Sequence, residues 1–209
     1  MANIAPPGTL FARLRAACAH EWRAYAEHEF VRRLGDGTLP EACFRRYLAQ
    51  DYLFLIHFAR AYALAAYKAT AVEDVREAAA MVTAIVDTEM RLHVAQCARW
   101  DLSEPQMAAT PEAPATLAYT RYVLEAGMAG DLLDLHVALA PCVVGYAEIA
   151  ARLRSDCKPD NPYAEWIESY AGAEYQDVGR AAVARLDRLA ASRGGDARFP
   201  ALASTFRTA

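Results

Sequence analysis

The sequence predicts an all-α fold, an irregular bundle of about seven or eight helices in one domain covering residues 1–209. Of the 209 residues, 47 are Ala, whereas Val, Ile and Thr together number 27. Alanine favours helices and is depleted in strands, so this composition argues against a β-sandwich or barrel. Hydrophobic residues make up 55% of the chain and charged residues 23%, which is typical of a globular domain and argues against disorder.

Helix start and stop signals predict the first two long helices. Thr9 can cap a helix over about 9–34, which the turn residues at 35–37 should end. A second helix is expected over about 40–69. Thr38 and Glu41 have the spacing of a capping box before it.

The later helices are predicted from the same kinds of start and stop signals. Thr70 and Glu73 repeat the capping-box spacing, and Pro162 suits a first helical position. The further helices are expected over about 70–100, a short turn at 103–106, 115–126, 131–154, 161–193 with a bend at Gly172, and a final stub after 195.

Charge and cysteine content exclude several classes of protein. The net charge is −4 and no Lys/Arg cluster could follow a phosphate backbone, so we expect no nucleic-acid partner. Five cysteines without a CxxC pair argue against a disulfide framework and against structural zinc. The sequence shows no signal peptide and no charge-free apolar run of membrane-spanning length, so we expect a cytoplasmic protein that does not span a membrane.

One acid interrupts the apolar helix predicted over 40–69. Asp51 shares a stripe of that helix with Tyr47, Phe54 and Phe58. A buried carboxylate is costly unless it has a partner. Two interpretations remain open: Asp51 pairs with an arginine from a neighbouring helix, or it contacts a polar ligand.

A proline lies inside the helix predicted over 131–154. Pro141 should kink this helix and leave the Val137 carbonyl without its usual donor. Cys142 follows the proline directly, with Tyr146 one turn further on the same face. The kink could open a pocket beside the thiol, but the residues alone favour a small buried hydrophobic side chain.

Aromatic and metal-ligating residues give weaker signals. Eleven tyrosines are many, and a pocket walled by tyrosines with one acid and one thiol would suit a flat, polar heteroaromatic ligand. Glu89 and His93 lie four residues apart and could share a metal, but the Glu-x-x-His pattern of di-iron bundles is absent. We interpret them as a hydrogen-bonded core pair and expect no metal.

Several motifs in consistent order, over about residues 10–206, carry a family resemblance. These motifs are Phe30-Val31, Gly35 to Pro40, Phe44 to Leu53, Pro141-Cys142, Tyr146 and Tyr163 to Tyr170 with Trp166-Ile167. Together they resemble the TenA/thiaminase II family.

The resemblance implies a haem-oxygenase-like all-α fold that assembles as a homotetramer. It also implies a hydrolase of thiamine salvage, which converts aminomethyl pyrimidine to hydroxymethyl pyrimidine and ammonia. Thiamine itself would be cleaved to pyrimidine and thiazole alcohols. The partner is then a small-molecule aminopyrimidine, and no metal or organic cofactor is required.

Site residues are carried over position by position. Cys142 matches the family's nucleophilic cysteine, and Asp51 matches the aspartate that binds and polarises the pyrimidine. Phe54 stands where some members have a tyrosine, so it can stack but donates no hydrogen bond. The tyrosines that match those around the substrate and the thiol are Tyr119, Tyr146 and Tyr170.

One expected residue is missing from the pattern. The family carries a glutamate on its last helix, and the sequence reaches Phe206 and then ends before that residue. We therefore expect a domain that ends before the family's last helix, with Glu174 a conceivable local acid. The alternatives are a metal- or haem-dependent oxygenase with His20 as axial ligand, and a non-catalytic pyrimidine-binding or regulatory protein.

Overall fold

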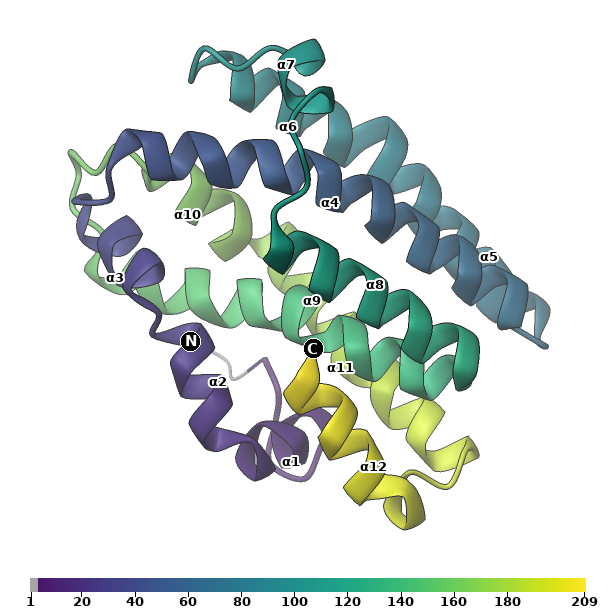
Figure 1. The fold of residues 1–209 in the computed structure, drawn as a ribbon. Helices are drawn as coiled ribbons and strands as arrows, with labels where there is room; N and C mark the ends of the chain where they lie inside the picture. The colour runs from purple at the N-terminus through teal and green to yellow at the C-terminus, as the bar shows by residue number, and fades with distance from the viewer. Residues whose placement is uncertain (1–3) are drawn as a thin grey trace. The chain divides into compact units, whose positions relative to one another are not determined.

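The computed structural model describes residues 4–209, and in that range it contains helices and turns but no β-strand (Figure 1). The predicted all-α class is therefore confirmed. The chain divides into two compact units. We call Pro40–Leu135 the middle unit, and Met1–Leu39 together with His136–Ala209 the terminal unit. The division falls inside one long helix, α9 (Leu132–Asp156).

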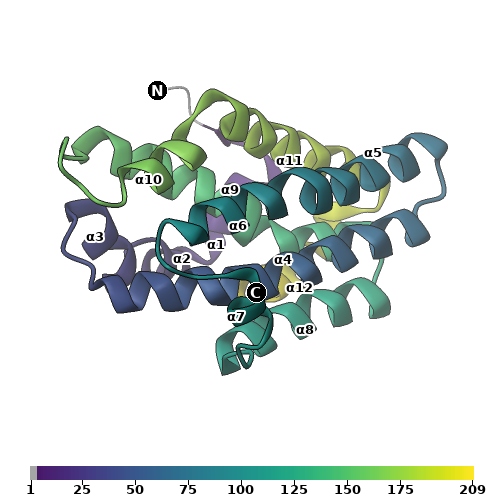
Figure 2. The ribbon, with the colours of Figure 1, turned by 90° about the horizontal axis from the view of Figure 1, so that it is seen from above.

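The middle unit is organised around α4 (Glu41–Lys68), a helix of 28 residues. The helices that follow it in the chain pack against it, and α5 and α8 both run beside it (Figures 1 and 2). Phe44, Leu48 and Leu55 lie on its buried face. The later elements are α5 (Val72–Thr83), the π-helical segment η1 (Ala84–Glu89), α6 (Met90–Ala98), α7 (Glu104–Ala108) and α8 (Pro114–Ala129).

Lys68 joins the ends of α4 and α8. Its ammonium group donates hydrogen bonds to the main-chain carbonyls of Gly127 (2.7 Å), Met128 (2.8 Å) and Gly130. These carbonyls lie at the C-terminal end of α8, where unpaired acceptors and the helix dipole favour a cation. One lysine therefore ties the last turn of α4 to the last turn of α8.

The terminal unit is built from the helices at both ends of the chain and the greater part of α9. Asn161 fixes the turn after its third helix: its Nδ2 donates to the carbonyls of Leu34 (3.0 Å) and Gly35 (2.8 Å). Gly37 ends that helix with a φ of +81°, a conformation that favours glycine. The elements are α1 (Leu10–Ala17), α2 (Ala19–Ala26), α3 (Glu29–Asp36), α9 from His136, α10 (Ala164–Ala171), α11 (Ala173–Ser192) and α12 (Gly195–Thr208).

The helices are more numerous than the seven or eight predicted, in part because the stretch expected as one helix over 9–34 forms three. Thr9 caps the first as predicted, accepting a hydrogen bond of 3.3 Å from the N–H of Ala12. The chain then leaves the helical path at Cys18, with φ −114°, and at Glu27, with φ −109°. Neither residue is a Gly or Pro, so the sequence does not mark either break.

Both predicted capping boxes are wrong. The N-cap of α4 is Pro40 and that of α5 is Ala71, and neither makes a side-chain capping bond. Thr38 instead donates its hydroxyl hydrogen to Asp36 Oδ1 at 2.6 Å, so its side chain serves the preceding turn. The short turn expected at 103–106 is confirmed, because α7 begins there with a complete capping box.

Among residues 4–209, one helix has the length and composition of a membrane span, and that helix is α9. Its most apolar stretch is 78% buried within the structure. A buried core helix meets the same criterion. The expectation that the chain does not span a membrane therefore stays a prediction.

Replacing Lys68 with Met should lower the free energy of unfolding by about 1.5–3 kcal/mol, because three carbonyls at the end of α8 lose a charged donor. Urea unfolding measures the loss as a lower midpoint at an unchanged m-value. Lys158 is the other lysine of the chain and lies exposed in the loop after α9, so it supplies the matched control. Lys158→Met should change stability by less than about 0.5 kcal/mol. Equal losses in the two variants would contradict the role of Lys68.

Candidate active site

Asp51 lies on the buried face of α4, with 9% of its surface exposed. Burial raises the pKa of its carboxyl group to about 7, and a hydrogen bond with Tyr47 opposes part of that rise. A large share of the molecules therefore hold Asp51 as a neutral acid at neutral pH. Its side chain can then donate a proton as well as accept a hydrogen bond.

The structure pairs Asp51 with a histidine, where the simpler interpretation expected an arginine. His93 Nδ1 lies 3.5 Å from Asp51 Oδ2, and His93 Nε2 lies 2.9 Å from the carbonyl oxygen of Leu48. Burial lowers the pKa of His93, and the hydrogen bond to Leu48 opposes part of the shift. The imidazole of α6 therefore meets α4 through both of its nitrogens.

Two more acids belong to the same cluster. Burial, and then the charge of Asp51, raise the pKa of the Glu89 carboxyl to about 7. The same two causes raise the pKa of the Cys97 thiol to about 12. The spacing of Glu89, His93 and Cys97, every four residues, could have predicted one helix face. Sequence reasoning linked the first two and missed both Cys97 and the connection to Asp51.

Aromatic rings line α4 one turn after Asp51. Phe54 stacks on Phe58, with ring centroids 5.2 Å apart, and on Tyr119 of α8 at 5.9 Å. The interplanar angles are 28° and 25°. The structure thus brings together Phe54 and Tyr119, two of the predicted substrate-binding residues. A face of parallel rings is suited to a flat ligand.

Cys142 lies on α9 within the terminal unit and is half-buried, unlike the fully buried Cys18. Tyr25 of α2 donates its hydroxyl hydrogen to the carbonyl of Pro141 at 3.2 Å. Burial raises the pKa of Tyr25, and the charge of Cys142 raises it further. Gly145 makes this approach possible, because a Cβ there would lie 2.9 Å from the hydroxyl oxygen of Tyr25. Sequence reasoning missed Tyr25.

An aromatic cluster gathers on the same unit. Tyr146 and Tyr170, both predicted site residues, have ring centroids 5.0 Å apart, and Trp166 lies 4.8 Å from Tyr170. Tyr175 of α11 adds an edge contact to Tyr170 at 4.8 Å, which the sequence did not predict. The cluster is centred on Tyr170 and includes Tyr146, which lies one turn after Cys142 on α9.

The predicted site residues therefore fall into two sets, one in each unit. Asp51, Phe54 and Tyr119 belong to the middle unit, and the structure brings them together on or against α4. The terminal unit holds the others, which are Cys142, Tyr146 and Tyr170.

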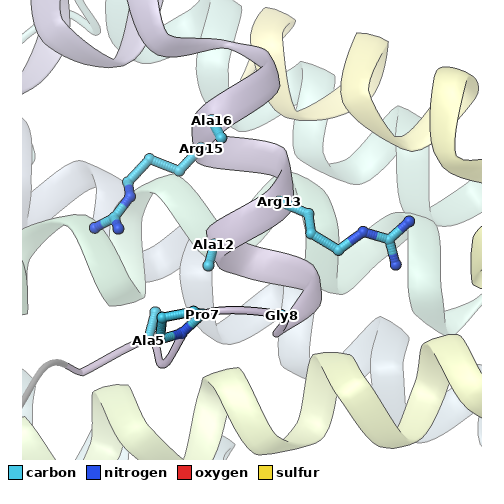
Figure 3. Close-up of a pocket in the computed structure, with 7 residues that line it drawn as sticks. All are labelled: Ala5, Pro7, Gly8, Ala12, Arg13, Arg15 and Ala16. Atoms are coloured by element: carbon cyan, nitrogen blue, oxygen red, sulfur yellow. The ribbon is translucent and has the colours of Figure 1, made fainter.

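A surface pocket of about 350 Å³ lies at the start of α1 (Figure 3). Its two cationic side chains, Arg13 and Arg15, extend in opposite directions. Arg13 pairs with Asp196 at 2.6 Å, and Arg15 pairs with Glu148. Both charges are already neutralised, and none of the predicted site residues lines this pocket.

Residues named for the alternative interpretations lie on the surface. His20, the candidate axial ligand, is exposed on α2, and Glu174, the candidate local acid, is exposed in the first turn of α11. Within residues 4–209, no three His, Cys, Asp or Glu side chains are grouped as a metal site would require.

Comparison with known proteins gives a consistent result. A 42% identical, uncharacterized protein of Haemophilus influenzae aligns over 80% of this chain and 79% of its own length. An aminopyrimidine aminohydrolase of Halalkalibacterium halodurans is 36% identical over 81% of this chain and 76% of its own.

A crystal structure described as a TenA family transcription regulator from Silicibacter sp. TM1040 superposes with a TM-score of 0.92. The two chains are 44% identical, over 97% of this chain and 92% of that one. The model of the TENA/THI-4/PQQC family matches residues 15–207. This protein therefore belongs to the TENA/THI-4/PQQC family.

Proposed function

We propose that the protein is an aminopyrimidine aminohydrolase of thiamine salvage. It hydrolyses aminomethyl pyrimidine to hydroxymethyl pyrimidine and ammonia, and also cleaves thiamine to pyrimidine and thiazole alcohols. The observation that carries this function is Asp51, a buried carboxyl group with a pKa raised to about 7, so that a large share of the molecules hold its proton at neutral pH. The 36% identity to a protein named for this activity supports the substrate class.

Asp51 has the hydrogen-bonding capacity that an aminopyrimidine requires. The ring presents a nitrogen that accepts a hydrogen bond beside an amino group that donates one. A protonated carboxyl donates through its O–H and accepts through its other oxygen, so one side chain satisfies both groups. Phe54 and Tyr119 supply parallel aromatic faces for stacking the ring.

Cys142 is the nucleophile in this scheme. Its thiolate adds to a ring carbon, the new C–S bond displaces an electron pair onto the ring nitrogen, and that nitrogen takes the proton of Asp51. The C–N bond of the methylene carbon then breaks, and the amine, which enters protonated as its ammonium form, leaves as ammonia with the electron pair. Water adds to the methylene carbon and loses a proton, the C–S bond breaks and the thiolate returns, and the ring nitrogen gives its proton back to Asp51. Two easier steps thus replace one difficult displacement.

Tyr146 and Tyr170 act beside the nucleophile in the same scheme. Their hydroxyl groups are suited to hydrogen-bond the thiolate or the departing amine. Their mutual packing with Trp166 holds both rings in place. We also assign the protein to the cytoplasm, as a homotetramer in which each chain acts as one domain without a metal or organic cofactor.

A non-catalytic binding protein is the second candidate. The 44% identical structure described as a transcription regulator favours testing it. Such a protein would bind the pyrimidine and release no ammonia. Metal analysis of the purified protein separates both candidates from an oxygenase.

Aminomethyl pyrimidine should be the better substrate than thiamine. Ammonia release from the first and thiazole alcohol release from the second give kcat/KM for each compound under one set of conditions. Salvage chemistry requires a higher value for aminomethyl pyrimidine. Near-equal efficiencies would contradict the salvage assignment, and pyrimidine binding without ammonia release would favour the second candidate.

Cys142→Ser should lower kcat by at least about 1,000-fold, because a hydroxyl at neutral pH is a far weaker nucleophile than a thiolate. Calorimetry should still detect pyrimidine binding, and circular dichroism should show unchanged helix content. Cys157 is likewise half-buried and lies in the loop after α9, so Cys157→Ser is the matched control and should keep full activity. Full activity of Cys142→Ser would exclude the covalent route.

Asp51→Asn should separate binding from turnover. An amide can donate to the ring nitrogen but cannot transfer its proton, so kcat should fall by about 10²- to 10⁴-fold. KM should change much less, because the hydrogen bond to the ring is retained. Steady-state kinetics at pH 7 measure both quantities, and an unchanged kcat would remove Asp51 from the chemistry.

A further inference from the structure

His93 touches α4 at two points, and the two contacts fix where its proton lies. The carbonyl oxygen of Leu48 can only accept a hydrogen bond, so His93 Nε2, at 2.9 Å, must carry the hydrogen. The other nitrogen, Nδ1, faces Asp51 Oδ2 at 3.5 Å. Both side chains are buried, with 7% and 9% of their surfaces exposed.

The protonation state of this pair follows from that geometry. Burial lowers the pKa of His93, so the ring is neutral at neutral pH and Nδ1 presents a lone pair. An ionised Asp51 would oppose this lone pair with its own, whereas a protonated Asp51 can donate to it after a small rotation of either side chain. The contact therefore favours the neutral acid.

Among residues 4–209, the titratable groups recorded around Asp51 are a tyrosine, a histidine, a carboxyl group and a thiol. Tyr47, on the same helix, donates a hydrogen bond that lowers the pKa of Asp51. Glu89 on η1 and Cys97 on α6 are acids, and their own pKa values are raised by burial and then by the charge of Asp51. Of these groups, His93 places an acceptor nitrogen 3.5 Å from Asp51 Oδ2.

We propose that His93 is a positioning residue that keeps Asp51 protonated between turnovers, so that the incoming pyrimidine meets a neutral acid rather than a carboxylate. The inference rests on the proposed function. When substrate binds, the ring nitrogen replaces His93 Nδ1 as the acceptor of the carboxyl hydrogen. When product leaves, the proton returns to Asp51 and the contact with His93 forms again. No proton is gained or lost over the cycle.

Replacing His93 should therefore change the pH profile of kcat/KM and leave the pH profile of kcat unchanged. The pH profile of kcat/KM reports groups of the free enzyme, and that of kcat reports groups of the substrate complex. His93→Gln can keep a donor near the Leu48 carbonyl but loses the ring acceptor. Without that acceptor the pKa of Asp51 falls. As the pH is raised, kcat/KM should therefore begin to decline at a lower pH than in the native protein. We expect about a two- to tenfold loss of kcat/KM at pH 7.5 and an unchanged kcat profile.

Two more variants separate this role from a structural one. His93→Asn restores an amide acceptor near the position of Nδ1, so its kcat/KM profile should lie closer to that of the native protein. His57, also on α4, is half-buried and pairs with Glu112 at 2.9 Å, so His57→Gln is the matched control and should leave both profiles unchanged. A native kcat/KM profile in His93→Gln, or equal shifts in kcat and kcat/KM, would overturn the proposal.

A measurement on the native protein covers the case in which the variants do not fold. The ¹⁵N NMR spectrum of His93 should show hydrogen on Nε2 and none on Nδ1 at pH 7, and a cationic ring would overturn the proposal. If the native protein releases no ammonia, the proposed function fails but the inference about the pair is still tested. The ¹³C titration of the Asp51 carboxyl should then move to lower pH in His93→Gln, and an unmoved titration would refute it.

Discussion

The burial of one carboxyl group determines the chemistry of the middle unit. A charged acid loses strong hydration when it is buried, so Asp51 either keeps its proton or needs donors around it. Burial favours the neutral form, and the hydrogen bond with Tyr47 favours the charged form. The balance leaves its pKa at about 7, within reach of both states. A pKa near the working pH is what general acid–base catalysis favours.

The helix face that carries Glu89, His93 and Cys97 is oriented by a local helix geometry that the sequence does not predict. Between α5 and α6 the chain passes through the π-helical segment η1, which ends at Glu89. A π-turn carries an extra residue and rotates the phase of everything that follows, and such turns recur at functional sites. His93 and Cys97 follow Glu89 at intervals of four, so one change of phase orients all three toward α4. Sequence periodicity predicted one continuous helix over 70–100 and could not reveal the extra residue of the π-turn.

Sequence reasoning succeeded where a residue type alone dictates the backbone, and failed where packing decides. Gly37 ends α3 and Gly172 separates α10 from α11, as turn residues should. The breaks at Cys18 and Glu27 have no such marker, which is why one predicted helix became three. Asp51 was noticeable because charge is rare on a buried face. Its partner was not, since a contact between α4 and α6 joins residues 42 positions apart.

Cys97 shows what the surroundings of Asp51 do to a thiol. It is a thiol beside Asp51, and burial together with the charge of that acid raises its pKa to about 12. A thiol in this environment stays protonated and is a poor nucleophile. The features that keep a proton on Asp51 therefore suppress thiolate formation next to it. Cys142, the proposed nucleophile, belongs to the other unit and is half-buried on α9. A reaction that needs a protonated acid and an ionised thiol at one pH requires two different environments, and the proposed acid and the proposed nucleophile belong to different units.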